Sequence, residues 1–142
     1  MITYLDTSTL VKLYIEESES EEVKNLIDKS NSVSTSLIAY TEARAAFARR
    51  YREKAFSRAQ FIKLKDALNK DWDHFLIIIL TKEISFLAGD LAEKHKLRGF
   101  DAIHLASAIT IKQKLSSPII FSCADQKLQK ASKKEGLDQP LF

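Results

Sequence analysis

The sequence predicts an α/β domain with a central, mainly parallel sheet and helices on both of its faces. Short segments with the β-branched character of strands alternate along the 142 residues with segments whose apolar residues recur at helical spacing. The chain has three glycines and two prolines and contains no internal repeat, linker or low-complexity segment, as is typical of a compact, helix-rich domain. We therefore expect a single domain over residues 1–142.

Four segments are predicted to form the strands of this sheet: Ile2–Leu5, Ser32–Ser36, Phe75–Leu80 and Pro118–Ser122. The third is a continuous run of six apolar residues, so we expect it to be buried on both faces of the sheet. The tail, residues 137–142, is expected to add a short edge strand.

Helical periodicity predicts the intervening helices. The longest should pack through Ala39, Ala43, Ala46 and Phe47, with its arginines on the other side. Ser57 and Thr81 are typical N-cap residues, and Gly136 is a typical C-terminal stop. The expected helices cover residues 7–14, 17–29, 37–55, 58–72, 82–95, 100–114 and 124–134.

Composition and charge exclude several classes of protein. A hydrophobic content of 45% is too high for a disordered chain, and no apolar run approaches the roughly 20 residues of a membrane helix. The first residues lack the basic and apolar regions of a signal peptide, and the single Cys123 cannot form an internal disulfide. We therefore expect a cytoplasmic protein that makes no membrane contact.

The basic residues are concentrated in one part of the chain. Residues 43–70 contain nine Lys or Arg against two acids, whereas residues 16–22 contain five acids and no base. A basic block can contact phosphates, but taken alone this one is more typical of a solvated helix face.

Four acids are predicted to face one edge of the sheet, beyond the carboxyl ends of its strands, where ligands of α/β sheets bind. Carboxylates packed together repel and raise one another's pKa, but a hard cation such as Mg²⁺ or Mn²⁺ makes the cluster tolerable. Three of them are also plausible helix N-caps, and Glu42 is a plausible surface residue or ion-pair partner. The acids are Asp6, Glu42, Asp101 and Asp125.

Four motifs resemble those of VapC-type PIN domains, and they occur in the family's order over nearly the whole chain. They are YLDTSTLVKLY at residues 4–14, SLIAYTE at 36–42, LRGFDAIHLA at 97–106 and FSCADQKL at 121–128. The family's acids fall on Asp6, Glu42, Asp101 and Asp125. The sequence departs from the family at Cys123, where a threonine or serine is usual, and a thiol is a poor ligand for a hard cation.

The resemblance implies a three-layer PIN-like fold and a metal-dependent endoribonuclease, the toxin of a VapBC-type toxin–antitoxin pair. The four acids would then hold Mg²⁺ or Mn²⁺ and catalyse hydrolysis of RNA, with Ser8, Arg49 and Arg98 as candidate substrate contacts. The implied partners are a second copy of the chain and a small VapB-type antitoxin, through which alone operator DNA would be contacted. The alternative is a non-catalytic PIN-like module that binds RNA or protein.

Other residues are less informative. His104 lies one helical turn from Asp101, but no Ser/His/Asp set surrounds it, so a structural histidine is the favoured interpretation. A receiver-type phosphorylation domain is disfavoured because Leu80 is followed by Thr81 rather than by an acid. A phosphatase-like hydrolase would need a second acid at Ser8, two residues after Asp6.

Overall fold

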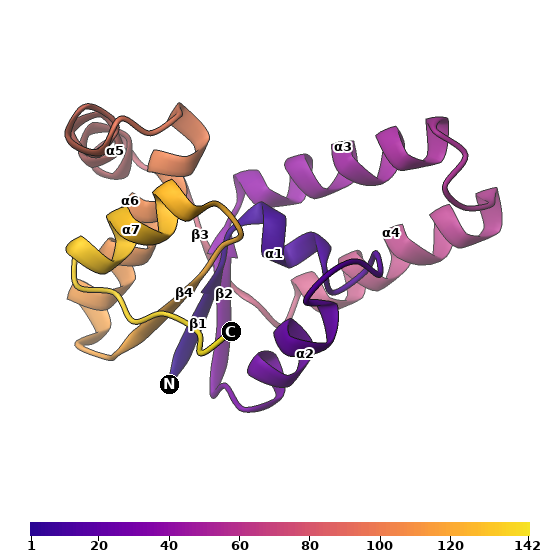
Figure 1. Cartoon of the computed structure of the whole chain (residues 1–142), viewed down its shortest axis with the longest axis horizontal. Helices are drawn as coiled ribbons and strands as arrows, with labels where there is room; N and C mark the ends of the chain where they lie inside the picture. Colours follow the sequence, from indigo (N-terminus) through magenta and orange to yellow (C-terminus); the bar gives the residue numbers. More distant parts are fainter.

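The computed structural model describes all 142 residues and contains a four-stranded sheet between two groups of helices (Figure 1). The strands are β1 (Ile2–Leu5), β2 (Ser32–Ser36), β3 (Leu76–Ile78) and β4 (Ile119–Ser122). They lie in the order β3-β2-β1-β4, and every pairing is parallel. The predicted α/β architecture with a parallel sheet is confirmed.

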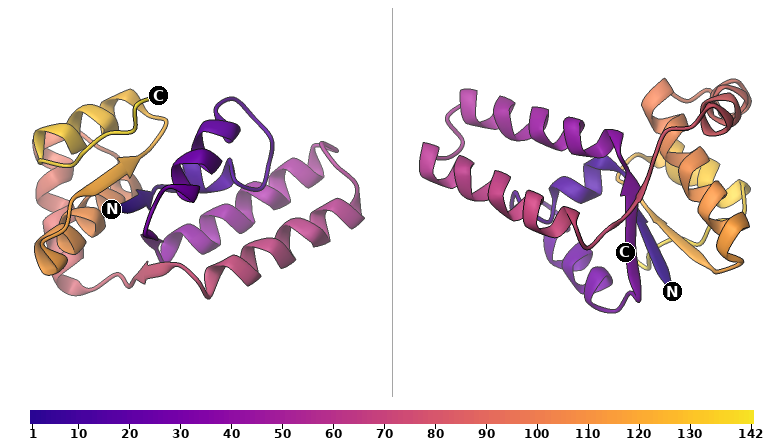
Figure 2. Two further views of the ribbon diagram at one scale, coloured as in Figure 1. Left: turned by 90° about the horizontal axis from the view of Figure 1, so that it is seen from below. Right: turned by 180° about the vertical axis from the view of Figure 1, so that it is seen from behind.

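The helices divide between the two faces of the sheet (Figure 2). Each group covers its own cluster of buried hydrophobic side chains, and none of the helices is both long and apolar enough to cross a lipid bilayer. One face carries α1 (Thr7–Val11), α2 (Ser20–Asp28), α3 (Ile38–Arg52) and α4 (Arg58–Trp72), and the other carries α5 (Lys82–His95), α6 (Gly99–Leu115) and α7 (Gln126–Lys134).

Strand β1 contributes side chains to both cores. Ile2 and Tyr4 belong to the core under α5, α6 and α7, whereas Leu5 belongs to the core under the other helices. Successive side chains of a strand point to opposite faces, which explains this alternation. Tyr4 is fully buried and stacks on Phe121 of β4 with 5.4 Å between ring centroids. Packing on both faces therefore fixes the position at which β1 ends.

Strand β2 is buried over its last three residues, 34–36, although all three carry hydroxyl groups. Ser34 donates a hydrogen bond to the carbonyl of Leu76, and Thr35 donates one to the carbonyl of Leu5, both at 2.7 Å. These bonds provide partners for polar groups that would otherwise be costly to bury. The hydroxyls also tie β2 to the strands on either side of it.

Helices α3 and α4 form a hairpin that projects well beyond the sheet (Figure 1). Its base is buried through Ala43 and Phe47, as the predicted packing face requires. Its outer end is held by stacked aromatic rings, with 4.7 Å between the centroids of Tyr51 and Phe61 and with Phe56 against both. Ser57 caps α4 with a full capping box, which confirms that prediction.

The burial predicted for the third strand was wrong. β3 pairs only with β2, so it is an edge strand, and it is shorter than the apolar run. The side chain of Ile79, just beyond it, is 64% exposed, and that of Leu76 is 40% exposed. A continuous apolar run is expected of a central strand, but the run does not reveal the order of the strands in the sheet.

The tail forms less structure than predicted. It contributes one isolated parallel bridge, between Asp138 and Ile120, rather than a strand. The amide of Phe121 donates to the carbonyl of Asp138 at 2.9 Å, and Pro140 soon follows, which has no N–H to continue the pairing. The chain reverses before it at Gly136, whose φ of 86° confirms the predicted helix stop.

We expect Phe47→Ala to lower the free energy of unfolding by about 3–5 kcal/mol, because the fully buried ring leaves a cavity between α3 and α1. The matched change Phe86→Ala removes a ring that is 65% exposed and should cost less than about 0.5 kcal/mol. Urea unfolding of both variants measures the difference. Equal losses would show that the α3 base does not anchor the hairpin.

Candidate active site

A pocket of about 910 Å³ opens at the carboxyl edge of the sheet, between α1, α3 and the start of α6. This edge is where ligands bind in open parallel sheets. Every site residue predicted from the sequence except Asp125 lines this pocket. The predicted residues that line it are Asp6, Ser8, Glu42, Arg49, Arg98 and Asp101.

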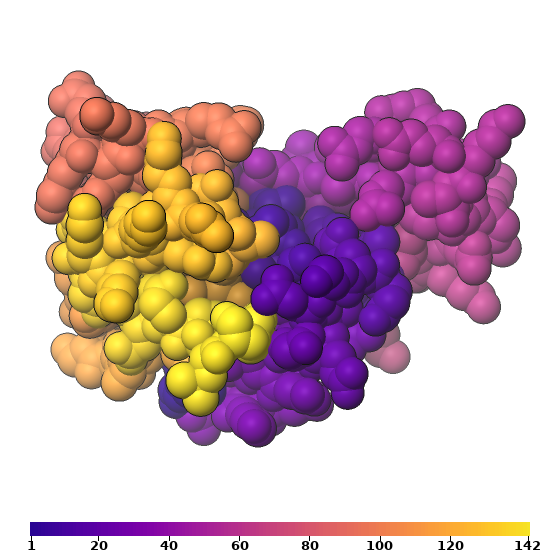
Figure 3. All heavy atoms as spheres, viewed as in Figure 1, coloured from indigo at the N-terminus to yellow at the C-terminus, as the bar shows by residue number.

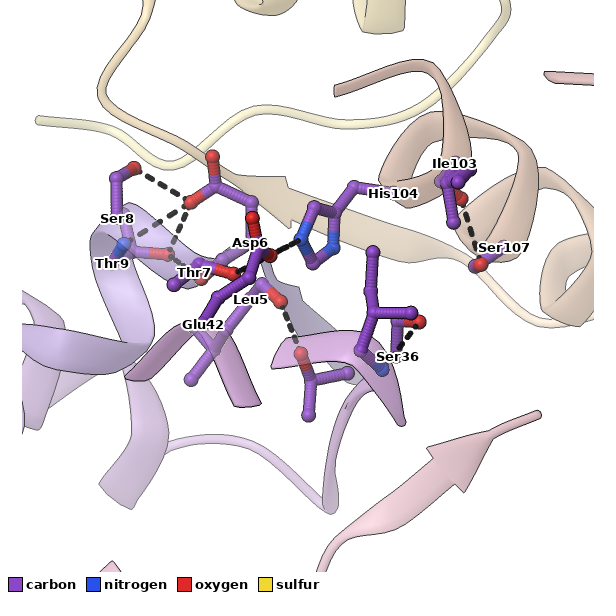
Figure 4. Close-up of polar contacts among 12 residues, drawn as sticks. Leu5, Asp6, Thr7, Ser8, Thr9, Ser36, Glu42, Ile103, His104 and Ser107 are labelled. Atoms are coloured by element: carbon purple, nitrogen blue, oxygen red, sulfur yellow. Dashed lines mark hydrogen bonds and ion pairs between the residues drawn. The ribbon is translucent and has the colours of Figure 1, made fainter. Parts of the chain in front are cut away.

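Asp6 is placed by the end of β1 and by its role as the N-cap of α1 (Figure 4). Its Oδ1 accepts hydrogen bonds from the Ser8 hydroxyl at 2.7 Å and from the amide and hydroxyl of Thr9 at 3.1 and 3.2 Å. Its Oδ2 accepts none. Burial raises the pKa of Asp6, although the nearby His104 and the hydrogen bonds to Oδ1 oppose the rise. The protein thus fixes one oxygen and leaves the other free.

Ser8 has a second contact besides Asp6. Its hydroxyl also accepts a hydrogen bond at 3.2 Å from the amide of Ala124, in the loop after β4. The Ser8 hydroxyl therefore orients Asp6 and joins α1 to that loop.

Glu42 lies in the second turn of α3, which begins directly after β2. Its Oε1 accepts hydrogen bonds from the Thr7 hydroxyl and from Nε2 of His104, the latter at 3.2 Å (Figure 4). Burial raises the pKa of this half-buried carboxyl, but the bonds from His104 and Thr7 outweigh burial and leave the pKa below its usual value. As in Asp6, the second oxygen accepts no hydrogen bond.

His104 lines the pocket and contacts Glu42. The sequence favoured a structural histidine and did not predict this contact. The His104 ring is 2% exposed, with Nδ1 2.8 Å from the Tyr4 hydroxyl and Nε2 3.1 Å from the Thr7 hydroxyl. It therefore links the buried core to Glu42. The clue was its spacing, because a residue three positions after Asp101 shares its face of the helix.

Asp101 stands in the first turn of α6, three residues after the N-cap position at Arg98. The N-cap interpretation is therefore wrong for Asp101. The helix precedes β4 and runs back across the sheet, so its first turn lies at the carboxyl edge. Burial and the charge of Asp125 raise the pKa of Asp101, and the Arg98 guanidinium partly offsets the rise.

Asp125 lies at the margin rather than in the pocket. It is the exposed N-cap of α7, and its Oδ2 accepts a hydrogen bond from the Leu128 amide at 2.9 Å, so its cap interpretation is confirmed. Cys123 is buried beside it, and burial followed by the charges of nearby aspartates raises the pKa of the thiol. Cys123 therefore stays protonated at neutral pH, as a small buried residue.

The family model for the PIN domain matches residues 3–134. This chain belongs to the PIN domain family. The recognition made from the four sequence motifs is confirmed.

Curated PIN-domain relatives come from Mycobacterium tuberculosis. "Ribonuclease VapC45" is 37% identical over 114 residues, which cover 78% of this chain and 76% of the relative. "Ribonuclease VapC47" is 31% identical over 122 residues, which cover 83% and 82%.

Solved structures show the same PIN fold at low sequence identity. FitAcB from Neisseria gonorrhoeae has a TM-score of 0.68 at 17% identity, covering 98% of this chain and 96% of that one. VapBC2 from Rickettsia felis, bound to a DNA fragment from its promoter, has a TM-score of 0.65 at 15% identity, covering 98% and 97%. These similarities establish the fold alone.

The donor set of this PIN domain fits a partly hydrated hard cation. No three His, Cys, Asp or Glu side chains are already arranged as ligands of one ion. Mg²⁺ needs no such cage, because it usually keeps several waters and binds through one or two carboxylates. Asp6 and Glu42 each present an oxygen without a hydrogen bond, and Asp101 lines the same pocket.

We expect Asp6→Asn to raise the melting temperature of the metal-free protein at neutral pH. The folded-state pKa of Asp6 lies above the unfolded value of about 3.9, so ionised Asp6 destabilises the fold. This gain in melting temperature should vanish as the pH falls through the folded-state pKa towards the unfolded-state pKa, because Asp6 is then neutral in both the folded and the unfolded protein.

Thermal melts in EDTA across pH test this expectation, with the exposed Asp90→Asn as the control. A lower melting temperature for Asp6→Asn at neutral pH would contradict it. Added Mn²⁺ should stabilise the native protein, whose site is intact, more than the variant.

Proposed function

We propose that this chain is a metal-dependent endoribonuclease and the toxin of a VapBC-type toxin–antitoxin pair. The observation that carries the proposal is the convergence of Asp6, Glu42 and Asp101 on one pocket that Arg49 and Arg98 also line. Membership of the PIN domain family and the ribonuclease names of the curated relatives support it.

The acids would hold Mg²⁺ or Mn²⁺ directly or through its waters. When bound, such an ion supplies a water of lowered pKa and neutralises the charge that develops on the phosphate oxygens. Asp6 and Asp101 are the proposed direct ligands, and Glu42 is held by Thr7 to face the same pocket. Asp125 would act from the margin, where its charge already affects Asp101.

The arginines are proposed to hold the RNA backbone. Arg98 and Arg49 are exposed and line the pocket from two elements, Arg98 directly before α6 and Arg49 on α3. Neither forms an ion pair, so both guanidinium groups are free for phosphate. Arg50 is committed instead to Glu17, at 3.2 Å.

We propose a small VapB-type antitoxin as the protein partner, because the structural relatives include VapBC2 bound to promoter DNA and a FitAB complex bound to a DNA fragment. Operator DNA would be contacted only through that antitoxin. A homodimer is proposed as well, since Ile79, directly after the edge strand β3, and Phe86, on α5, expose apolar surface. The proposal takes residues 1–142 as one domain acting in the cytoplasm.

We expect the double variant Asp6→Asn/Asp101→Asn to lose more than about 100-fold of the RNA-cleaving activity, since changes even to the groups that support metal ligands cost about 10–100-fold. The measurement is cleavage of ribosomal RNA with Mg²⁺, with Mn²⁺ and with EDTA. The matched control is Asp66→Asn/Asp90→Asn, which makes the same charge change at exposed positions on α4 and α5.

Cleavage that survives in EDTA or in the folded double variant would refute the proposed site. If the native protein neither cleaves RNA nor binds Mn²⁺, the enzyme proposal fails and the non-catalytic RNA- or protein-binding module takes its place.

A further inference from the structure

A smaller hollow lies on the α5, α6 and α7 side of the molecule and is lined largely by lysines. It has a volume of about 200 Å³ and lies between the end of α5 and one face of α7. Figure 3 shows these two helices side by side, α5 in salmon above α7 in yellow. We call the exposed residues Lys94, Lys96, Lys127, Lys130 and Lys134 the lysine surface.

The charge of this surface is largely unbalanced. Lys94 and His95 share Glu135, each at 2.7 Å, whereas the other four lysines form no ion pair. Lys127 instead donates a hydrogen bond to the backbone carbonyl of Lys96 at 3.2 Å, which holds the Lys127 ammonium group against the C-terminal end of α5. Like charges gathered around one hollow repel, and a bound polyanion would relieve that repulsion.

The helix dipoles do not explain the whole arrangement. Cations are favoured at helix C-termini, which accounts for Lys94 and Lys134. Lys127 lies in the first turn of α7, where the dipole disfavours a cation. Lys127, Lys130 and Lys134 share one helix face at spacings of three and four and span about 10 Å along the axis. A row of this length fits an extended chain of phosphates better than a single small anion.

The lysine surface adjoins the acidic pocket. Lys96 is two residues before Arg98, which lines that pocket, and Lys127 is two residues after Asp125 at its margin. The lysine surface thus begins within two residues of the pocket at Arg98 and within two residues of its margin at Asp125.

We propose that the lysine surface binds the phosphodiester backbone of RNA outside the segment that occupies the acidic pocket. The proposal rests on the proposed ribonuclease function and extends it: the substrate is a long RNA held at two places, not a short oligonucleotide. Lysine side chains act as flexible point charges, so this contact adds affinity without sequence preference.

The test compares Lys127→Gln/Lys130→Gln/Lys134→Gln with Lys29→Gln/Lys70→Gln/Lys114→Gln. The control lysines are exposed, form no ion pair and precede β2, β3 and β4, so they lie at the opposite edge of the sheet. Fluorescence anisotropy with labelled oligouridylate measures binding in EDTA, where metal-dependent cleavage is absent, over a range of salt concentrations. Thermal melts verify that both variants fold.

We expect the lysine-surface variant to bind more weakly and to reduce the slope of log K against log salt by about 2, since each phosphate contact to single-stranded nucleic acid contributes about 0.7. For a fourfold rise in salt, the factor by which RNA affinity falls should then be roughly 15 times smaller for this variant than for the native protein. The control variant should keep the native slope.

Equal slopes for both variants would overturn the proposal and leave the nuclease function intact, because cleavage is measured separately. The proposal would also be overturned if the lysine-surface variant lost affinity for duplex DNA but kept its affinity for the labelled oligouridylate. If the native protein neither binds this RNA nor cleaves ribosomal RNA, the lysine-surface proposal and the proposed function both fail.

Discussion

The parallel pairing of β1 with β2 on one side and with β4 on the other is the constraint on which the site depends. Because these strands point the same way, the segments that follow them emerge at one edge. Asp6 follows β1, Glu42 follows β2 through α3, and Asp125 follows β4. Asp101 reaches the same edge from α6, which precedes β4 and so runs in the reverse direction. Acids far apart in the sequence thus meet without any long loop.

Holding these carboxylates together is unfavourable, and the surrounding residues stabilise them to different degrees. Hydrogen bonds stabilise one oxygen of Asp6 and one of Glu42, and the other oxygen of each is left without a hydrogen bond. Burial and the charge of Asp125 raise the pKa of Asp101, and Arg98 and His104 offset only part of the rise. The negative charge of Asp101, on α6, is therefore balanced only in part by neighbouring residues.

The sequence predicted the architecture and the strand residues of β2 well, because hydroxyl and β-branched residues bounded by helical patterns leave few alternatives. It misjudged Phe75–Leu80, since an apolar run describes the residues and not the strand's neighbours in the sheet. It brought Asp6 and Asp101 together because both were expected at the carboxyl edge of the predicted sheet, and the resemblance to the family's motifs pointed to the same two acids. His104 was undervalued because its partners, Tyr4 and Thr7, lie about a hundred positions away in the chain.

The aromatic stack at the outer end of the α3–α4 hairpin separates the stability of the hairpin from the position of the acids. Tyr51, Phe56 and Phe61 stack on one another at the tip, and Phe56 and Phe61 also pack against the core that α3 and α4 share with α1. Glu42 is held near the other end of α3, where Thr7 and His104 bond to it. The contacts that hold the hairpin together and the contacts that orient this carboxylate therefore lie at opposite ends of one helix.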